Sequence, residues 1–343
     1  MDLSNLRMVF WAVSGLAFVA NPEAALSQQY SIPALKEIGS FGVLTGDPAL
    51  EFGQIIGIAA HEGIIYTIDE TTHVLSAFTQ QGEFLSSIGR RGAGPEEFSW
   101  PKSVVADASG VHVLDVGNAR IARFRLESDT LRYVGQTRFP LAMGWDFCAL
   151  EGDYFILKYD AGRGGLIQRL DREGNVEAFG RAFVEGDAMM ASVTDFGLVV
   201  CDAAGQALYV VSNMAPTVRA YTAPGVLLWD VILPGKVVPI ITRTEGGVQV
   251  TQPPSGERPD HSVSISVIPG GPVLVQYGES PRRGAPTQEI GDVTSVLFNA
   301  ADGSVLATSD DLPRIDFSSN SFAYSYLIEL FPRVTIYEWT NDG

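Results

Sequence analysis

The stretch GRRGAGPEEFSWPKSVVADASGVHVLDVGNARIARF, residues 89–124, decides the fold of this chain. A Gly/Pro-rich turn leads into a short apolar segment, which a Ser-Gly turn separates from a second segment ending at Asp115. A third segment begins at Arg120. Short runs of β-branched residues between Gly and Asp turns are typical of strands. The stretch therefore predicts three short strands in succession.

The same order of strands and turns recurs along the chain at a nearly constant step. Asp69 ends the second strand of an earlier copy, 46 residues before Asp115, and Asp160 ends that of a later copy, 45 residues after it. Self-similarity at such a period indicates a repeat architecture. The copies loosen toward the C-terminus and cover residues 53–89, 97–139, 140–183, 189–234, a fifth from Ser262 onward and a last over 321–339.

Two segments depart from the repeat. Residues 235–261 are rich in Pro, Gly and polar groups, so we expect an insertion or a long loop there. The last copy stops one strand short, and Ala34–Phe41 resembles the fourth strands of other copies. We predict that this N-terminal strand joins the C-terminal blade, because closure removes exposed sheet edges. The sequence thus predicts an all-β fold, a six-bladed β-propeller of four-stranded antiparallel blades.

The motif also carries a family resemblance. GAGPEEF (92–98) followed by SVVADASGVHVLDVGNARIARF (103–124) resembles the NHL-repeat type of six-bladed propeller found among exported bacterial proteins. The resemblance extends into the first copy and fades beyond residue 140. It implies that Asp115, Asn118 and Arg120 are chiefly a structural trio, and it implies a fold more than an activity.

Composition excludes some partners. The net charge of −17 would repel nucleic acid and anionic membranes, because phosphate binding needs a basic surface. Arg7, the apolar run 8–20 and the small residues 25–27 predict a signal peptide over residues 1–27. We therefore expect residues 28–343 to form a periplasmic or extracellular, monomeric propeller with no membrane insertion after the signal is removed.

The two cysteines leave one question open. Cys148 and Cys201 fall in the first strands of adjacent repeats. An exported protein permits a disulfide between them, whereas buried free thiols behave as small hydrophobic groups. The sequence leaves both alternatives standing.

Aromatic residues mark one candidate ligand site. Trp100 lies 15 residues before Asp115, and Trp145 lies 15 residues before Asp160. Equal offsets in equal repeats place both indoles just before the innermost strands, at the rim of the central channel. They either stack on a ligand or pack between blades.

Charged residues mark two further candidates. Loop arginines expected on one face of the propeller could bind a carboxylate or phosphate; they are Arg90, Arg91, Arg163, Arg282 and Arg283. Asp146 is the best single carboxylate for calcium or another hard cation in the channel. The sequence identifies no cofactor and no catalytic motif.

The function that follows is a binding module for an unknown small molecule or protein, acting through its loop-rich face. The alternative is a metal-dependent hydrolase or lyase with carboxylate ligands in the channel. Whether the protein is an enzyme stays open at this point.

Overall fold

A computed structural model of the chain describes residues 30–139, 144–160, 164–184, 188–279, 290–328 and 330–340. The chain divides into two units, Met1–Tyr30 and Ser31–Gly343. All of the strands described below belong to the second unit.

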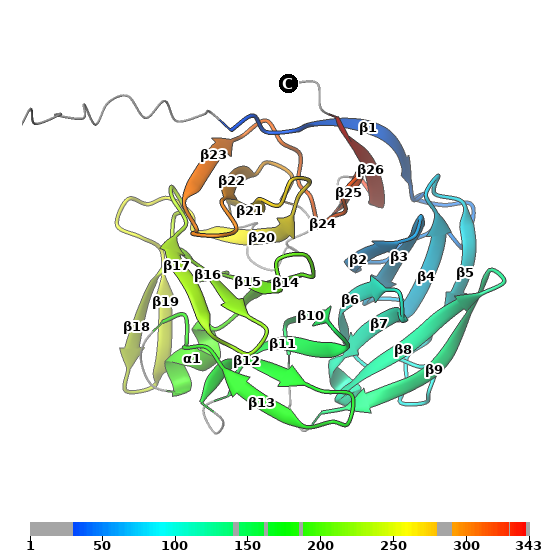
Figure 1. The fold of residues 1–343 in the computed structure, drawn as a ribbon, viewed down its shortest axis with the longest axis horizontal. Coiled ribbons are helices and arrows are strands. Elements are labelled where there is room, and N and C mark those ends of the chain that lie inside the picture. The colour runs from blue at the N-terminus through cyan, green and yellow to red at the C-terminus, as the bar shows by residue number, and fades with distance from the viewer. Residues whose placement is uncertain are drawn as a thin grey trace, which may run out of the picture. The chain divides into compact units, whose positions relative to one another are not determined.

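Six four-stranded antiparallel sheets follow one another around a ring and form the blades of a propeller (Figure 1). In each of the first five blades the strands pair in sequence order, with the first strand innermost. The predicted all-β, six-bladed propeller is therefore confirmed.

The strands of blades 1 and 2 are β2 (Ile55–His61), β3 (Ile64–Asp69), β4 (Val74–Thr79), β5 (Phe84–Ile88), β6 (Pro101–Asp107), β7 (Gly110–Asp115), β8 (Arg120–Glu127) and β9 (Thr130–Arg138). The strands of blades 3 and 4 are β10 (Asp146–Leu150), β11 (Asp153–Asp160), β12 (Gly165–Leu170), β13 (Val176–Phe179), β14 (Gly197–Asp202), β15 (Ala207–Ser212), β16 (Thr217–Thr222) and β17 (Leu227–Ile232). Those of blades 5 and 6 are β20 (Asp260–Val267), β21 (Val273–Glu279), β22 (Thr294–Phe298), β23 (Val305–Ser309), β24 (Phe317–Ser318), β25 (Phe322–Ile328), β26 (Pro332–Thr340) and β1 (Ala34–Phe41).

Blade 6 combines strands from the N-terminal and the C-terminal parts of the chain. Its strand order is β1-β26-β25-β24, so the N-terminal strand is outermost (Figure 1). β1 pairs antiparallel with β26 from Ala34↔Thr340 to Phe41↔Val334. The predicted closure is present, and it covers the edge that β26 would otherwise expose.

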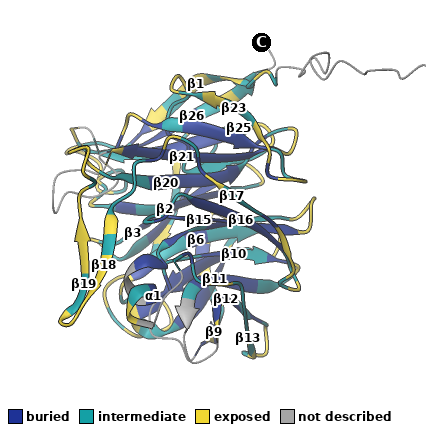
Figure 2. Cartoon of the chain, turned by 90° about the vertical axis from the view of Figure 1, so that its left-hand side faces the viewer, coloured by how far each residue is buried: buried dark blue, intermediate teal, exposed yellow. Residues whose placement is uncertain are grey.

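Apolar side chains of neighbouring blades interlock to form the core. One cluster, for example, joins Ile68 and Leu75 of blade 1 to Val104, Val113 and Phe124 of blade 2, all at most 4% exposed. The middle strands are buried on both faces, because each blade packs between two others (Figure 2).

The decisive stretch begins at a glycine for a steric reason. Gly89 has a φ of +128°, and a Cβ there would lie 2.3 Å from the carbonyl oxygen of His73. Any other residue would strain this turn into blade 2.

Three short elements go beyond the sequence predictions. The expected insertion contains a hairpin, β18 (Ile240–Thr244) with β19 (Gly247–Thr251), whose residues are largely exposed (Figure 2). A seven-residue helix, α1 (Ala188–Thr194), precedes blade 4. The inner strand of blade 6, β24, has only two residues.

Candidate functional site

A cavity of about 480 Å³ lies along the propeller axis. Its walls come from the inner strands of all six blades, β2, β6, β10, β14, β20 and β24. Hydrogen bonds place the beginnings of three of these strands side by side, since Asp146 of β10 accepts from both Ser103 of β6 and Val199 of β14. We call the end of the cavity at which these strands begin the channel mouth.

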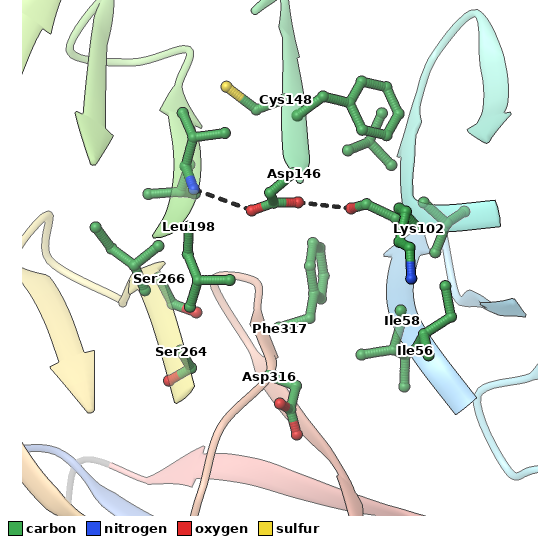
Figure 3. A pocket seen from close by; sticks show the side chains of 18 of the residues that line it. Ile56, Ile58, Lys102, Asp146, Cys148, Leu198, Ser264, Ser266, Asp316 and Phe317 are labelled. Atoms are coloured by element: carbon green, nitrogen blue, oxygen red, sulfur yellow. Dashed lines mark hydrogen bonds between the residues drawn. The ribbon is translucent and has the colours of Figure 1, made fainter. Parts of the chain in front are cut away.

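Asp146 lies in the wall of the cavity at the channel mouth. Its Oδ1 accepts a hydrogen bond from the Ser103 hydroxyl at 2.7 Å, and its Oδ2 accepts one from the Val199 N–H at 2.9 Å (Figure 3). Burial raises the pKa of the carboxyl above its ordinary value, although both hydrogen bonds favour the ionised form. The side chain thus bridges three blades while it faces the cavity.

Lys102 and Glu70 form an ion pair beside it. Lys102 Nζ lies 2.9 Å from Glu70 Oε1, with both side chains mostly shielded from solvent. The ammonium also lies 4.5 Å from the ring centroid of Trp100, a cation–π contact. Trp100 itself has a φ of +66°, unusual for a bulky residue. The ion pair and the ring hold one another in place at the start of β6.

A second ion pair comes from blade 6. Arg314 donates through Nε and Nη2 to Oδ1 of Asp316, at 2.8 and 2.6 Å, and both side chains are at most 3% exposed. Asp316 Oδ2 also accepts the N–H of Tyr326, and the Tyr326 hydroxyl donates to the Ile56 carbonyl of blade 1. This network ties blade 6 to blade 1 at the channel wall.

The rest of the cavity wall combines apolar and polar side chains. Ile56, Ile58, Leu198 and Phe317 line the cavity together with Ser264 and Ser266 (Figure 3). Cys148 and Cys201 also line it and form a disulfide that joins the inner strands of blades 3 and 4. Of the two alternatives left open by the sequence, the structure therefore has the bridge. A cavity that combines apolar side chains with convergent polar groups has the character of a ligand pocket.

The two tryptophans have different surroundings. Trp145 lines the cavity and packs edge-on against Phe196, with ring centroids 4.4 Å apart. Trp100 is 39% exposed and reaches the cavity only through Lys102, which lines it. The two tryptophans thus occupy equivalent positions directly before β6 and β10, but of the two only Trp145 lines the channel.

The arginines are not brought together within the described residues. Arg90 pairs with Glu97 on the surface, and Arg91 is exposed; neither lines the cavity. Arg163, Arg282 and Arg283 lie outside the described residues.

The Asp-Asn-Arg trio supports the loop that enters blade 2. Asp115 accepts from Arg120 Nε at 2.9 Å and from Asn118 Nδ2 at 2.6 Å. Arg120 also donates to the carbonyls of Gly94 and Glu97 and to Gln136. All of these partners are protein groups, which is the structural role that the family resemblance implied.

Metal ligands do not converge in the described part of the chain. No group of three His, Cys, Asp or Glu side chains lies there close enough to bind an ion. Asp146, the predicted metal ligand, is instead surrounded by hydrogen-bond donors and apolar residues.

Sequence reasoning missed Glu70, Lys102, Arg314 and Asp316. A usable signal exists for the first two, because Lys102 is the second residue of a predicted first strand and Glu70 directly follows the repeat-marking Asp69. The other two lie in the most degenerate repeat, where no register is visible from sequence.

The closed ring of six blades around one cavity defines the class of the protein, a six-bladed β-propeller. Residues 40–171 match the model of the DUF5128 family, described as a 6-bladed beta-propeller. The propeller inferred from the resemblance of residues 89–124 is thus confirmed at the level of the fold. No curated protein matches the sequence. Within the described residues, no helix has both the length and the apolar character to cross a membrane.

Solved structures agree on the fold. A member of the DUF4221 family from Bacteroides vulgatus has 9% identity and a TM-score of 0.58, covering 89% of this chain and 98% of that one. A Bacteroides fragilis protein described as exported has 11% identity and a TM-score of 0.54, covering 91% and 98%. Virginiamycin B lyase from Staphylococcus aureus has 11% identity and a TM-score of 0.51, covering 89% and 99%. At these identities the likeness shows the fold alone.

Proposed function

We propose that the protein is an exported binding module of the NHL-repeat type that takes a small ligand into its channel mouth. The observation that carries this proposal is the cavity of about 480 Å³ on the propeller axis. Its volume falls within the roughly 300–1,000 Å³ of small-molecule sites. Its wall also combines charged groups at the channel mouth with apolar side chains such as Leu198 and Phe317, which suits a ligand that has both a polar group and a hydrocarbon part.

Export is supported by two observations. The Cys148–Cys201 disulfide suits an oxidising compartment, because cytosolic thiols are kept reduced. The leader over residues 1–27 has the composition of a signal peptide. We therefore place the folded propeller, residues 28–343, in the periplasm or outside the cell.

The enzyme alternative has less support. A metal-dependent hydrolase or lyase would need several ligands converging on the ion, and the described residues offer no such group. The likeness to virginiamycin B lyase, at 11% identity, is one of fold. We therefore favour ligand binding without catalysis as the function of this site.

A variant in which a larger side chain fills the cavity tests the proposal. Leu198 projects into the cavity (Figure 3), so Leu198→Trp should fill much of it. Leu228 is 47% exposed on β17 and does not line the cavity, so Leu228→Trp is the matched control. Small molecules and peptides that raise the melting temperature of the wild type should lose their effect in Leu198→Trp and keep it in Leu228→Trp. Equal effects in both variants would overturn the proposal.

A further inference from the structure

Among the described residues, the charged side chains of the channel mouth form ion pairs, with Asp146 as the exception. Lys102 is paired with Glu70, and Arg314 is paired with Asp316. Asp146 receives hydrogen bonds only from neutral donors, the Ser103 hydroxyl and backbone N–H groups, and no lysine or arginine of the described residues forms an ion pair with it. Among the described residues, no ion pair therefore offsets the negative charge that the ionised form of Asp146 carries at the wall of the cavity.

We infer that the ligand of the channel mouth carries an organic cation, an ammonium or a similar group, that pairs with the carboxylate of Asp146. This inference rests on the proposed function and specifies its ligand. An ionised carboxylate has about four acceptor positions, and the Ser103 hydroxyl and the N–H groups of Val199 and Phe147 use at most three of them. An incoming ammonium would supply charge-assisted hydrogen bonds to the remaining positions.

The surroundings of Asp146 favour an organic cation over an anion or a metal ion. An anionic ligand would bring a second negative charge next to an unpaired one, in a chain whose net charge is already −17. Calcium takes about six to eight oxygen ligands, and the described residues gather no such set. The apolar walls at Leu198 and Phe317 would instead contact a hydrocarbon body (Figure 3).

Three probes of one shape test the charge of the ligand. 2-Phenylethylammonium, 2-phenylethanol and 3-phenylpropionate share an aryl group and differ in the charge of the polar end. Isothermal titration of the protein at pH 7 should show the ammonium binding at least about tenfold more tightly than the alcohol, as a charge-assisted contact predicts. The carboxylate should bind more weakly than both. This comparison needs no variant and stands if a substitution impairs folding.

Substitutions then locate the contact. Asp146→Asn should bring the affinity for the ammonium down to that for the alcohol, with the melting temperature confirming that the variant is folded. Asp129→Asn removes a carboxylate from an exposed turn between β8 and β9, and should leave the tenfold preference unchanged. Ser103→Ala keeps the carboxylate and should keep the preference.

Several outcomes would overturn the inference. Tighter binding of 3-phenylpropionate would point to an anion site while leaving the proposed function standing. An ammonium preference that persists in Asp146→Asn would place the contact elsewhere. Binding of Ca²⁺ alone that is lost in Asp146→Asn would make the ligand a metal ion. Failure of all three probes, together with a screen that gives no ligand sensitive to Leu198→Trp, would instead remove the proposed function, and the inference with it.

Discussion

Arg120 is the side chain on which the turn into blade 2 most depends. Its guanidinium is 2% exposed and donates to Asp115, Gln136 and the carbonyls of Gly94 and Glu97. Arg120→Met would leave a buried carboxylate and two carbonyls without this donor. We expect a loss of about 3–5 kcal/mol in the free energy of unfolding, measured by urea denaturation.

An exposed ion pair provides the control for Arg120. Arg132 and Glu127 are paired at 3.6 Å with both side chains at least 50% exposed. Arg132→Met should change the free energy of unfolding by less than about 1 kcal/mol. Losses of similar size in the two variants would contradict the structural role assigned to Arg120.

Lys236 gives the protein a pH dependence. Its buried ammonium donates to the carbonyls of Ser212, Asn213 and Ala215 and to the hydroxyl of Ser262. Burial lowers the pKa of Lys236 to about 7, with a partly opposing attraction from Asp260. The folded protein therefore gives up this proton at a far lower pH than the unfolded chain, in which lysine titrates near 10.4.

The sign of the effect follows from linkage. Between about pH 7 and 10 the unfolded chain binds the extra proton, so the folded state gains stability as the pH rises. The free energy of unfolding of the wild type, relative to Lys236→Met, should increase by on the order of 1 kcal/mol per pH unit from pH 7.5 to 9.5. Urea denaturation at pH 6, 7.5, 8.5 and 9.5 measures it. A constant difference across the series would show that Lys236 keeps its proton.

At the scale of elements, the disulfide fixes β10 to β14. Cys148 and Cys201 are 53 residues apart in sequence. A cross-link over a loop of this length stabilises a protein by about 2–4 kcal/mol, chiefly by restricting the unfolded chain. The double variant Cys148→Ser/Cys201→Ser should unfold at correspondingly lower urea concentration, and reductant should destabilise the wild type but not the variant. Insensitivity of the wild type to reductant would argue against the bridge.

Whether an element could be predicted depended on the sequence pattern within that element. The strands of blades 1 and 2 were visible because Gly and Asp turns bracket short β-branched runs, as around Asp69 and Asp115. β24 has only two residues, too few to show any alternation. The strands of the hairpin β18–β19, IITRT and GVQVT, contain β-branched residues, but they are exposed and lie in a stretch rich in Pro, Gly and polar residues, so they did not stand out. Strand length and burial, more than propensity, separate the two groups.

At the scale of the whole molecule, closure by β1 should decide stability. Removing residues 1–41 would delete β1 and expose the edge of β26, whereas removing residues 1–29 leaves every described strand in place. We expect the longer deletion to lower the melting temperature strongly and to favour aggregation on size-exclusion chromatography. The shorter deletion should behave as the full chain does. Equal behaviour of the two would mean that blade 6 does not need its outer strand.

The site was harder to predict from the sequence than the fold, because its residues lie far apart along the chain. The channel mouth joins residues of blades 1, 2, 3 and 6, such as Glu70, Lys102, Asp146 and Asp316, which no local window contains together. Repeat register did locate Asp146 and Trp145, because both occur at the start of an inner strand. Register could not tell which carboxylates are already paired, since that depends on side-chain contacts between blades.

The proposed ligand of the channel mouth is an organic cation that pairs with Asp146. A crystal structure of the protein grown with 2-phenylethylammonium tests it most directly. We expect electron density in the cavity, with the ammonium nitrogen within hydrogen-bond distance of Asp146 and the ring against Leu198 and Phe317. Density only on an outer surface, with nothing but water beside Asp146, would contradict it.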